Sequence, residues 1–583
     1  MAFLALLRRP NRAITDRVAR AIERVQRERG FSRVYDSPTI TVLTLPNEPH
    51  LIVPDGSGII LGRLFEREGY TPVETGAAAE LSQLPAEFVA RYWGGYLALR
   101  TRHAAAEALR DPSGGVPCYH LAVDDLHVLT ASPALLVDLG LMEVEIEWTV
   151  VRQALVYRDL RPARTALRGL DEILPGVAAR ALPPGLTTEC VWSPWRFTEK
   201  EHEVADMDAA VTAVRSAASG SISAWGSRFG RPLVEISGGL DSAIVAAGLS
   251  GSHPNTQGVT FCALAGDTDE TPYARAIAER LKIELVAVGP EPQAVDLHRS
   301  ASGDLARPNA RSFAQALDWP ERRLGESIGA DAYFSGGGGD NVFSYLSSLS
   351  PIIDRLHREG LGRGVLKTMI DMAALGGTNP WAVAVRTARR LLHRRPPDDW
   401  PANAQFLVAE ATDSLALPDG HPWLPVPDGA LLGKRAQVMS LIRVQNHLDG
   451  HGRQAHAPII FPLLSQPLME TCLAIPSWLW SAGGRNRAVA RAAFADVLPA
   501  SAIARQSKGA FDSLCVQVLA AHHITLREML LDGALAQQGL IDRPAVERAL
   551  GAPAPDGGEV LRLLMLGDVE AWVSGWLERR DRQ

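Results

Sequence analysis

The chain has 583 residues, too many for one hydrophobic core, so two or more domains are expected. Its 46% hydrophobic and 21% charged residues are typical of a soluble globular protein, and no apolar run is long enough to span a membrane. The net charge of −7 argues against a general nucleic-acid-binding protein, and the 5 scattered cysteines, with no CxxC pair, are typical of reduced thiols.

Residues 11–30 are rich in arginine and carry apolar residues at helical spacing, among them Val18, Ile22 and Val25. This pattern predicts an amphipathic basic helix, and residues 1–38 are therefore assigned to an N-terminal helical segment. We expect its charged face to be solvated, with docking of an acidic peptide or partner as the alternative. The apolar residues 1–7 are too few for a signal peptide and precede their arginines, so a cytoplasmic protein is expected.

Residues 39–185 are predicted to form a β-rich domain, because short alternating or apolar runs are set off by glycine, proline and aspartate. Such runs occur at 39–44, 58–62 and 95–100. A Pro-Pro-Gly sequence then marks the domain end, and residues 186–230 are predicted to be a linker and an approach helix.

A predicted strand at 232–236 runs into the loop Ser237-Gly238-Gly239-Leu240-Asp241-Ser242, and an apolar helix follows. The glycines let backbone N–H groups approach an anion, and the helix start and both serines add further donors. Asp241 would repel phosphate unless Mg²⁺ lay between them. The loop therefore predicts a pyrophosphate site with its own metal ligand. It is not a Walker loop, since no Gly-Lys-Ser/Thr follows, and a glycine-rich turn without a ligand is the alternative.

Strands predicted at 258–264 and 284–288 around a helix indicate a parallel α/β domain over residues 231–583. A further strand, 332–334, feeds a second loop, Ser335-Gly336-Gly337-Gly338-Gly339-Asp340, that physically repeats the first. Asp241 and Asp340 are thus predicted to share Mg²⁺ on one triphosphate. The predicted nucleotide-binding residues are Ser237, Gly238, Gly239, Leu240, Asp241, Ser242, Phe261, Ser335, Gly336 and Gly337.

The C-terminal third supplies four candidates for catalysis. Asp449 and His451 are polar groups in a helix-and-loop segment, and a structural hydrogen-bonding role is the alternative for each. Arg505 precedes Lys508, which adjoins a glycine. A lysine on such a loop offers a mobile ammonium for the α-phosphate or a tetrahedral oxyanion, whereas an isolated Lys-Gly would be a surface turn.

Taken together, these motifs resemble the asparagine synthetase superfamily. The Ser-Gly-Gly-Leu-Asp-Ser loop resembles its pyrophosphate loop, and the stretch from Arg110 to Tyr119, followed by Ala131-Ser132, is similar to its glutamine amidohydrolase domain. The resemblance implies an α+β and α/β fold. In it, an Ntn-amidotransferase-like β-sandwich precedes a PP-loop domain of the adenine nucleotide α-hydrolase type, with ATP and Mg²⁺ as cofactors.

The chain departs from that family at several positions. The family's nucleophile is a cysteine directly after the initiator methionine, but Ala2 stands there, so glutamine hydrolysis is not expected. Gly337 replaces a glutamate, or the tyrosine of β-lactam synthetases, and Pro458 and Ile460 fall where a glutamate and an arginine would be. The four-glycine loop looks like that of lasso-peptide macrolactam cyclases in the same superfamily.

The resemblance implies an AMP-forming ligase that adenylates an Asp or Glu side chain of a precursor peptide and closes a macrolactam with the peptide's N-terminal amine. The implied partners are the core peptide, a leader peptidase and a leader-recognition protein, with neither nucleic acid nor membrane. A β-lactam-synthetase-like cyclase and an ammonia-dependent asparagine synthetase are alternatives that Gly337 disfavours. An inactive nucleotide-binding scaffold is the non-enzyme alternative, which the presence of Asp241, Asp340 and Lys508 disfavours.

Overall fold

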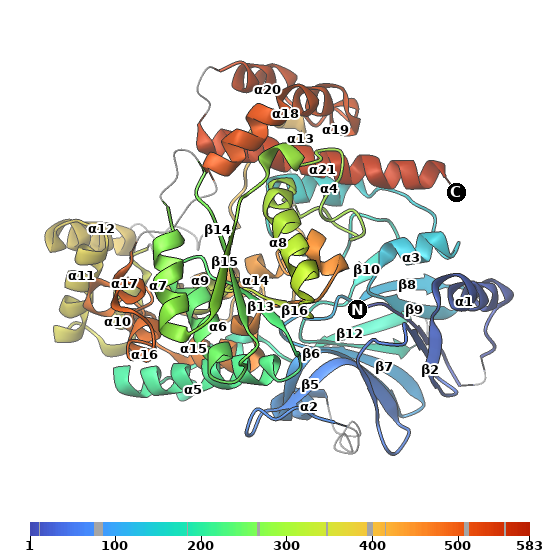
Figure 1. Ribbon diagram of the computed structural model, residues 1–583, viewed down its shortest axis with the longest axis horizontal. Coiled ribbons are helices and arrows are strands. Elements are labelled where there is room, and N and C mark those ends of the chain that lie inside the picture. Colours follow the sequence, from blue (N-terminus) through green and yellow to red (C-terminus); the bar gives the residue numbers. More distant parts are fainter. Residues whose placement is uncertain are drawn as a thin grey trace.

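The structure is a computed structural model in which an antiparallel β-sandwich adjoins a parallel sheet covered by helices (Figure 1). It describes residues 1–10, 12–74, 85–182, 185–264, 269–309, 311–345, 348–392, 400–413, 415–506, 512–552 and 556–582. Among these residues no helix is both long and apolar enough to cross a membrane.

The N-terminal sandwich consists of two six-stranded antiparallel sheets. The first has the order β10 (Leu170–Glu172), β8 (Tyr119–Val123), β9 (Leu126–Thr130), β1 (Phe3–Leu7), β3 (Ile40–Thr44) and β2 (Ser32–Asp36). The second has the order β12 (Gly185–Cys190), β11 (Val177–Leu182), β7 (Ala105–Arg110), β6 (Tyr92–Arg102), β5 (Gly58–Glu66) and β4 (His50–Ile52). The helices of this part are α1 (Asp16–Arg29), α2 (Pro85–Arg91), α3 (Pro133–Asp138) and α4 (Trp148–Val156).

Strand β1 explains the apolar start of the chain. Phe3, Ala5 and Leu7 contribute to the core between the sheets, while Leu4 and Leu6 pack with the buried face of α1. Because successive side chains of a strand point to opposite faces, a strand covered on both sides is apolar throughout. The predicted amphipathic helix is α1, which buries its apolar residues against this sheet.

The predicted boundary after residue 38 has to be corrected. Strands β1 and β2 both pair with β3, on its two sides, so residues 1–38 belong to the first sheet of the sandwich. The sequence pattern suggested a helical segment because a five-residue apolar strand without alternation gives no strand signal of its own.

All five strands of the third sheet are parallel, in the order β15 (Glu284–Val288), β14 (Gln257–Phe261), β13 (Pro232–Glu235), β16 (Ala332–Phe334) and β17 (Ile459–Ile460). The chain moves outward from β13 through β14 to β15 and then returns to the other side of β13 with β16. The strand order therefore reverses between β13 and β16. Crevices beyond the carboxyl ends of strands at such a reversal are the usual ligand sites of open α/β sheets.

Helices surround this sheet and join it to the sandwich (Figure 1). Helix α5 packs on α6, α15 and α16, and its apolar residues share a core with the outer face of the second sandwich sheet. The helices nearest the sheet are α5 (Met207–Gly226), α6 (Leu240–Ser250), α7 (Thr271–Leu281), α8 (Gln315–Ile328), α9 (Gly339–Val342), α14 (Leu432–Gln445), α15 (Gln466–Ala474), α16 (Ala488–Ala493) and α17 (Ala500–Ala504). The remaining helices are α10 (Ser350–Glu359), α11 (Arg363–Leu375), α12 (Pro380–Leu392), α13 (Ala409–Thr412), α18 (Asp512–Asp532), α19 (Ala534–Gln537), α20 (Arg543–Leu550) and α21 (Gly557–Asp581).

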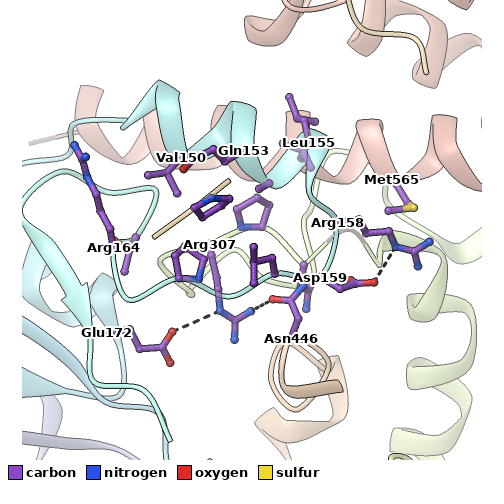
Figure 2. Close-up of a pocket in the computed structure, with 18 of the residues that line it drawn as sticks. Val150, Gln153, Leu155, Arg158, Asp159, Arg164, Glu172, Arg307, Asn446 and Met565 are labelled. Atoms are coloured by element: carbon purple, nitrogen blue, oxygen red, sulfur yellow. Dashed lines mark hydrogen bonds and ion pairs between the residues drawn. The ribbon is translucent and has the colours of Figure 1, made fainter. Parts of the chain in front are cut away.

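A buried ion-pair network joins the two halves. Glu172 of the sandwich accepts hydrogen bonds from Arg110 Nη1 at 2.8 Å and Arg161 Nε at 2.9 Å. Arg307, from the α/β half, lies 3.7 Å from the same carboxylate and donates to Asn446 and Asp449. Figure 2 shows this junction beside a small cavity of about 40 Å³, with Glu172 and Asn446 on either side of Arg307. Burial alone would raise the pKa of Glu172, but the surrounding guanidinium groups lower it to about 2.

Candidate active site

A cleft of about 840 Å³ opens beyond the carboxyl ends of β13, β14 and β16. Both glycine loops line it, as do Phe261, His451 and Arg505. Of the residues predicted from the sequence, those lining the cleft are Ser237, Gly239, Leu240, Asp241, Ser242, Phe261, Ser335, Gly336, Gly337, Asp340, His451 and Arg505. The cleft lies where the strand order reverses, so topology and sequence motif indicate the same place.

The first glycine loop holds its shape through its own contacts. The backbone N–H of Ser237 donates to Ser242 Oγ at 3.1 Å, and that hydroxyl donates to the Gly239 carbonyl at 3.3 Å. Gly238 has a φ of +71°, and a Cβ there would lie 2.7 Å from Tyr273 Cβ, so only glycine fits. Helix α6 begins directly after Gly239, which directs its N-terminal dipole toward the cleft.

The second glycine loop packs backbone to backbone against the first. A Cβ on Gly336 would lie 2.6 Å from the backbone nitrogen of Ser242. A Cβ on Gly339 would lie 2.4 Å from Asp241 Cγ. The glycines therefore serve the close approach of two loops from neighbouring strands, which brings their two aspartates together.

Arg487 connects these two aspartates. Its Nη1 lies 2.8 and 2.9 Å from the carboxylate oxygens of Asp241 and 2.7 Å from Asp340 Oδ1. Arg487 is 7% exposed, caps α16, and has a left-handed backbone with φ +55°. Its guanidinium also lies over the ring of Tyr345, 5.3 Å from the centroid. The sequence analysis did not select Arg487, because nothing in the sequence says which of the several arginines in this region faces the cleft.

The two carboxylates fit a divalent cation. Both face one positively charged nitrogen within 2.9 Å, so they converge on a single point in the cleft. Mg²⁺ prefers oxygen ligands and commonly binds one or two carboxylates together with substrate phosphates. Asp241 and Asp340 are therefore the residues that would hold Mg²⁺, and the ion would supply neutralisation of phosphate charge.

Arg505 forms an ion pair with Glu270 at the start of α7 and lies over the ring of Tyr273, 4.6 Å from its centroid. Glu270 is the residue directly before the first turn of α7, where a carboxylate is expected to face the helix dipole. It also lines the cleft and fixes Arg505 there, a contact across 235 residues that no local pattern reveals.

His451 and Asp449 make structural contacts. The His451 ring accepts from the Gln454 backbone in a capping box, and its Nε2 lies 3.0 Å from the His447 carbonyl oxygen. Burial and the charges of Arg311 and Arg453 hold its pKa well below the usual value, so the ring is neutral. Asp449 accepts from Arg161 and Arg307 in the junction network and does not line the cleft. Lys508 lies outside the described residues.

A family model for asparagine synthase matches residues 231–578, more than half of the chain. The chain therefore belongs to the asparagine synthase family, whose chemistry is ATP-dependent amide-bond formation. A search of curated proteins gave no match.

Two solved structures show a distant similarity. One is glutamine phosphoribosylpyrophosphate amidotransferase from B. subtilis complexed with ADP and GMP, with 8% identity, a TM-score of 0.21, and coverage of 57% of this chain and 90% of that chain. The other is described as the allosteric regulatory enzyme of purine biosynthesis, with 9% identity, a TM-score of 0.21, and coverage of 51% and 82%. At these TM-scores neither similarity bears on the fold.

Proposed function

We propose that this protein is an AMP-forming macrolactam cyclase of lasso-peptide type. In this proposal an Asp or Glu side-chain carboxylate of a core peptide is activated as its acyl-adenylate, and pyrophosphate leaves. The N-terminal amine of the same peptide then displaces AMP. The proposal rests on one observation: Asp241 and Asp340, one from each glycine loop, both lie within hydrogen-bond distance of the same Arg487 nitrogen in a cleft of about 840 Å³.

The size of the cleft is in keeping with a site that holds ATP together with part of a second substrate. Small-ligand pockets span about 300–1,000 Å³, and this one lies near the upper end.

Gly337 also favours the cyclase over the two alternative ligases, because a side chain there would lie 2.9 Å from the Phe461 ring. The tyrosine or glutamate of those enzymes would thus require Phe461 to move.

In this proposal the protein acts mainly by positioning and charge neutralisation. The glycine loops and the α6 N-terminus would face the phosphates, Asp241 and Asp340 would hold Mg²⁺, and Arg487 and Lys508 would offset developing negative charge. A leader peptidase and a leader-recognition protein are proposed as partners that deliver the core peptide with a free amine.

Mass spectrometry of a candidate core peptide incubated with the protein, ATP and Mg²⁺ tests this function. We expect a product lighter by one water, formed only with ATP, together with stoichiometric AMP. An unchanged peptide, or a peptide that gains ammonia at its carboxylate, would contradict the cyclase and, in the second case, favour an ammonia-dependent ligase.

A further inference from the structure

Beside the glycine loops, four charged side chains, three buried and one partly exposed, form a cluster on one side of the cleft. Arg453 is at its centre and forms ion pairs with Glu235, Asp318 and Glu321, the last at 3.3 Å. All four residues line the cleft. The cluster joins three elements, because Glu235 ends strand β13, Asp318 and Glu321 belong to α8, and Arg453 follows α14.

Glu235 is the member of the cluster that is best placed to meet a substrate. Its Oε2 accepts a hydrogen bond from Ser335 Oγ at 2.7 Å, so it touches the first residue of the second glycine loop. Its side chain is 24% exposed, compared with 3% for Asp318 and 1% for Glu321. Glu235 therefore presents a fixed carboxylate to the cleft, two residues before the first glycine loop begins.

Glu321 is the most deeply buried carboxyl group of the cluster. Both of its carboxyl oxygens are buried, and one of them lies 3.3 Å from Arg453 Nε. Burial raises the pKa of Glu321, and the charges of Glu235 and Asp318 raise it further against the opposing effect of Arg453. Arg311 also lines the cleft and interacts with Glu235 and Asp318, so two guanidinium groups face the three carboxyl groups.

In the proposed reaction the attacking amine must lose a proton, so a base has to reach the cleft. The resemblance to asparagine synthetases implies a glutamate at position 458, but this chain has Pro458, whose carbonyl oxygen accepts a backbone hydrogen bond from Tyr333. Tyr333 and Phe334 lie on β16, which separates β17 from β13. Pro458 precedes β17 and does not line the cleft, whereas Glu235 lies at the carboxyl end of β13 and does line it.

We propose that Glu235 is the base that takes the proton of the attacking amine, with Arg453 and Ser335 holding its carboxylate in place. This inference rests on the proposed function, since it assigns the amine subsite of that reaction. The amine nitrogen forms a bond to the carbonyl carbon of the activated carboxyl, and the bond from that carbon to the oxygen of AMP breaks. One amine hydrogen passes as a proton to the Glu235 carboxylate and then to water, while AMP leaves with the electron pair.

The variant Glu235→Gln tests the assignment. The amide oxygen still accepts from Arg453, and the amide NH₂ donates to the Ser335 hydroxyl, which can accept as well as donate, so the position is preserved, but an amide cannot take the proton. We expect peptide-dependent ATP–pyrophosphate exchange near the wild-type rate. Cyclisation should fall by at least about 10², the lower end of what general base catalysis contributes. Hydroxylamine is a nucleophile that is already unprotonated at neutral pH, so it should capture the activated carboxyl equally well in both proteins.

Two further variants serve as controls. Glu235→Asp keeps a carboxylate and should recover part of the cyclisation rate. Glu291→Gln changes a surface glutamate paired with Arg323 and should cyclise like the wild type. Wild-type cyclisation by Glu235→Gln would overturn the assignment. So would an equal loss of exchange, capture and cyclisation, which would indicate a purely structural role. A wild-type protein without peptide-dependent exchange would instead overturn the proposed function, and this assignment with it.

Discussion

Arg487 forms ion pairs with one aspartate from each of the two glycine loops. One of its nitrogens faces Asp241 and Asp340 together, at the point where a divalent cation bound to phosphate would be expected. A residue with φ +55° outside glycine carries backbone strain, and such strain persists where the surrounding contacts fix it. In the structure both carboxylates are thus paired with the guanidinium group of Arg487.

Replacing either aspartate by alanine should abolish adenylation while leaving the fold intact. Each change removes one carboxylate from the expected Mg²⁺ site, so phosphate charge is left uncompensated, at a cost of several kcal/mol or more than about 10² in rate. The measurement is ATP–pyrophosphate exchange by Asp241→Ala and Asp340→Ala. Asp304→Ala, at an exposed carboxylate paired with Arg579, is the matched control. Wild-type exchange by either site variant would show that this aspartate is not a ligand.

Lys508 lies outside the described residues, and its role stays a prediction. If its ammonium stabilises charge that develops during the reaction, Lys508→Ala should lower turnover by about 10²–10³ and weaken ATP binding much less. Lys508→Arg should also be poor, because a planar guanidinium does not replace a compact charge. Cyclisation rates and ATP dissociation constants of the three proteins are compared. A defect confined to ATP affinity would assign the lysine to nucleotide binding alone.

At this scale the sequence predicted the residues that stand in local motifs, including Asp241 and Asp340. It missed Arg487 and Glu235, and it proposed Asp449 for chemistry although the structure places that residue in the domain junction. The reason is physical. Glu235 looks like an ordinary strand residue until α8 and Arg453 are packed against it, and Asp449 differs from a cleft residue only by which way its loop faces.

At the scale of elements, the site depends on two strand-to-helix loops touching each other. The strands were predictable because parallel strands are apolar throughout and are followed by glycine-rich loops: the expected strands 232–236, 284–288 and 332–334 correspond to β13, β15 and β16. The contact between the loops was not predictable in detail, because it depends on the strand order, which places β16 directly beside β13.

Gly339→Ala tests this contact between elements. The new methyl group would lie 2.4 Å from Asp241 Cγ, so the loops must separate or Asp241 must turn away. We expect a loss of about 1–3 kcal/mol in stability and a larger proportional loss of pyrophosphate exchange. Gly289→Ala, where a Cβ would meet nothing within 4 Å, is the control. An alanine variant with unchanged exchange would mean that the spacing of the loops is not critical for adenylation.

At the scale of the whole molecule, the sandwich and the α/β half are joined by the network around Glu172. Arg110, Arg161 and Glu172 have fully buried side chains, and Arg307 and Asp449 complete the network from the other half. The pattern of short strands predicted a β-rich domain, and the β–α alternation predicted the parallel sheet, whereas the sandwich arrangement was implied only by the family resemblance. The network could not, since its members are scattered from residue 110 to residue 449 and each is an ordinary charged residue in its own segment.

Glu172→Gln should destabilise the protein by about 3–5 kcal/mol, because it leaves buried guanidinium groups without their partner. The pKa of Glu172 is about 2 in the folded protein, below the ordinary 4.5, so its stabilisation is present above pH 4.5 and is lost as the pH falls toward 2. Thermal unfolding midpoints should thus differ most at neutral pH and converge in acid. Glu189→Gln, at an exposed glutamate of β12, is the control. A gap that stays constant into acid would mean that ionisation of Glu172 is not the source of the stability.

The central claim is that a peptide carboxylate is activated by transfer of the adenylyl group in the cleft between the two glycine loops. The most direct test uses a core peptide whose reactive Asp or Glu side chain carries heavy oxygen, incubated with the protein, ATP and Mg²⁺. The oxygen that leaves the carboxyl group should appear in AMP, with one labelled AMP for each ring closed. Label in inorganic phosphate, or ring closure with unlabelled AMP, would contradict the account.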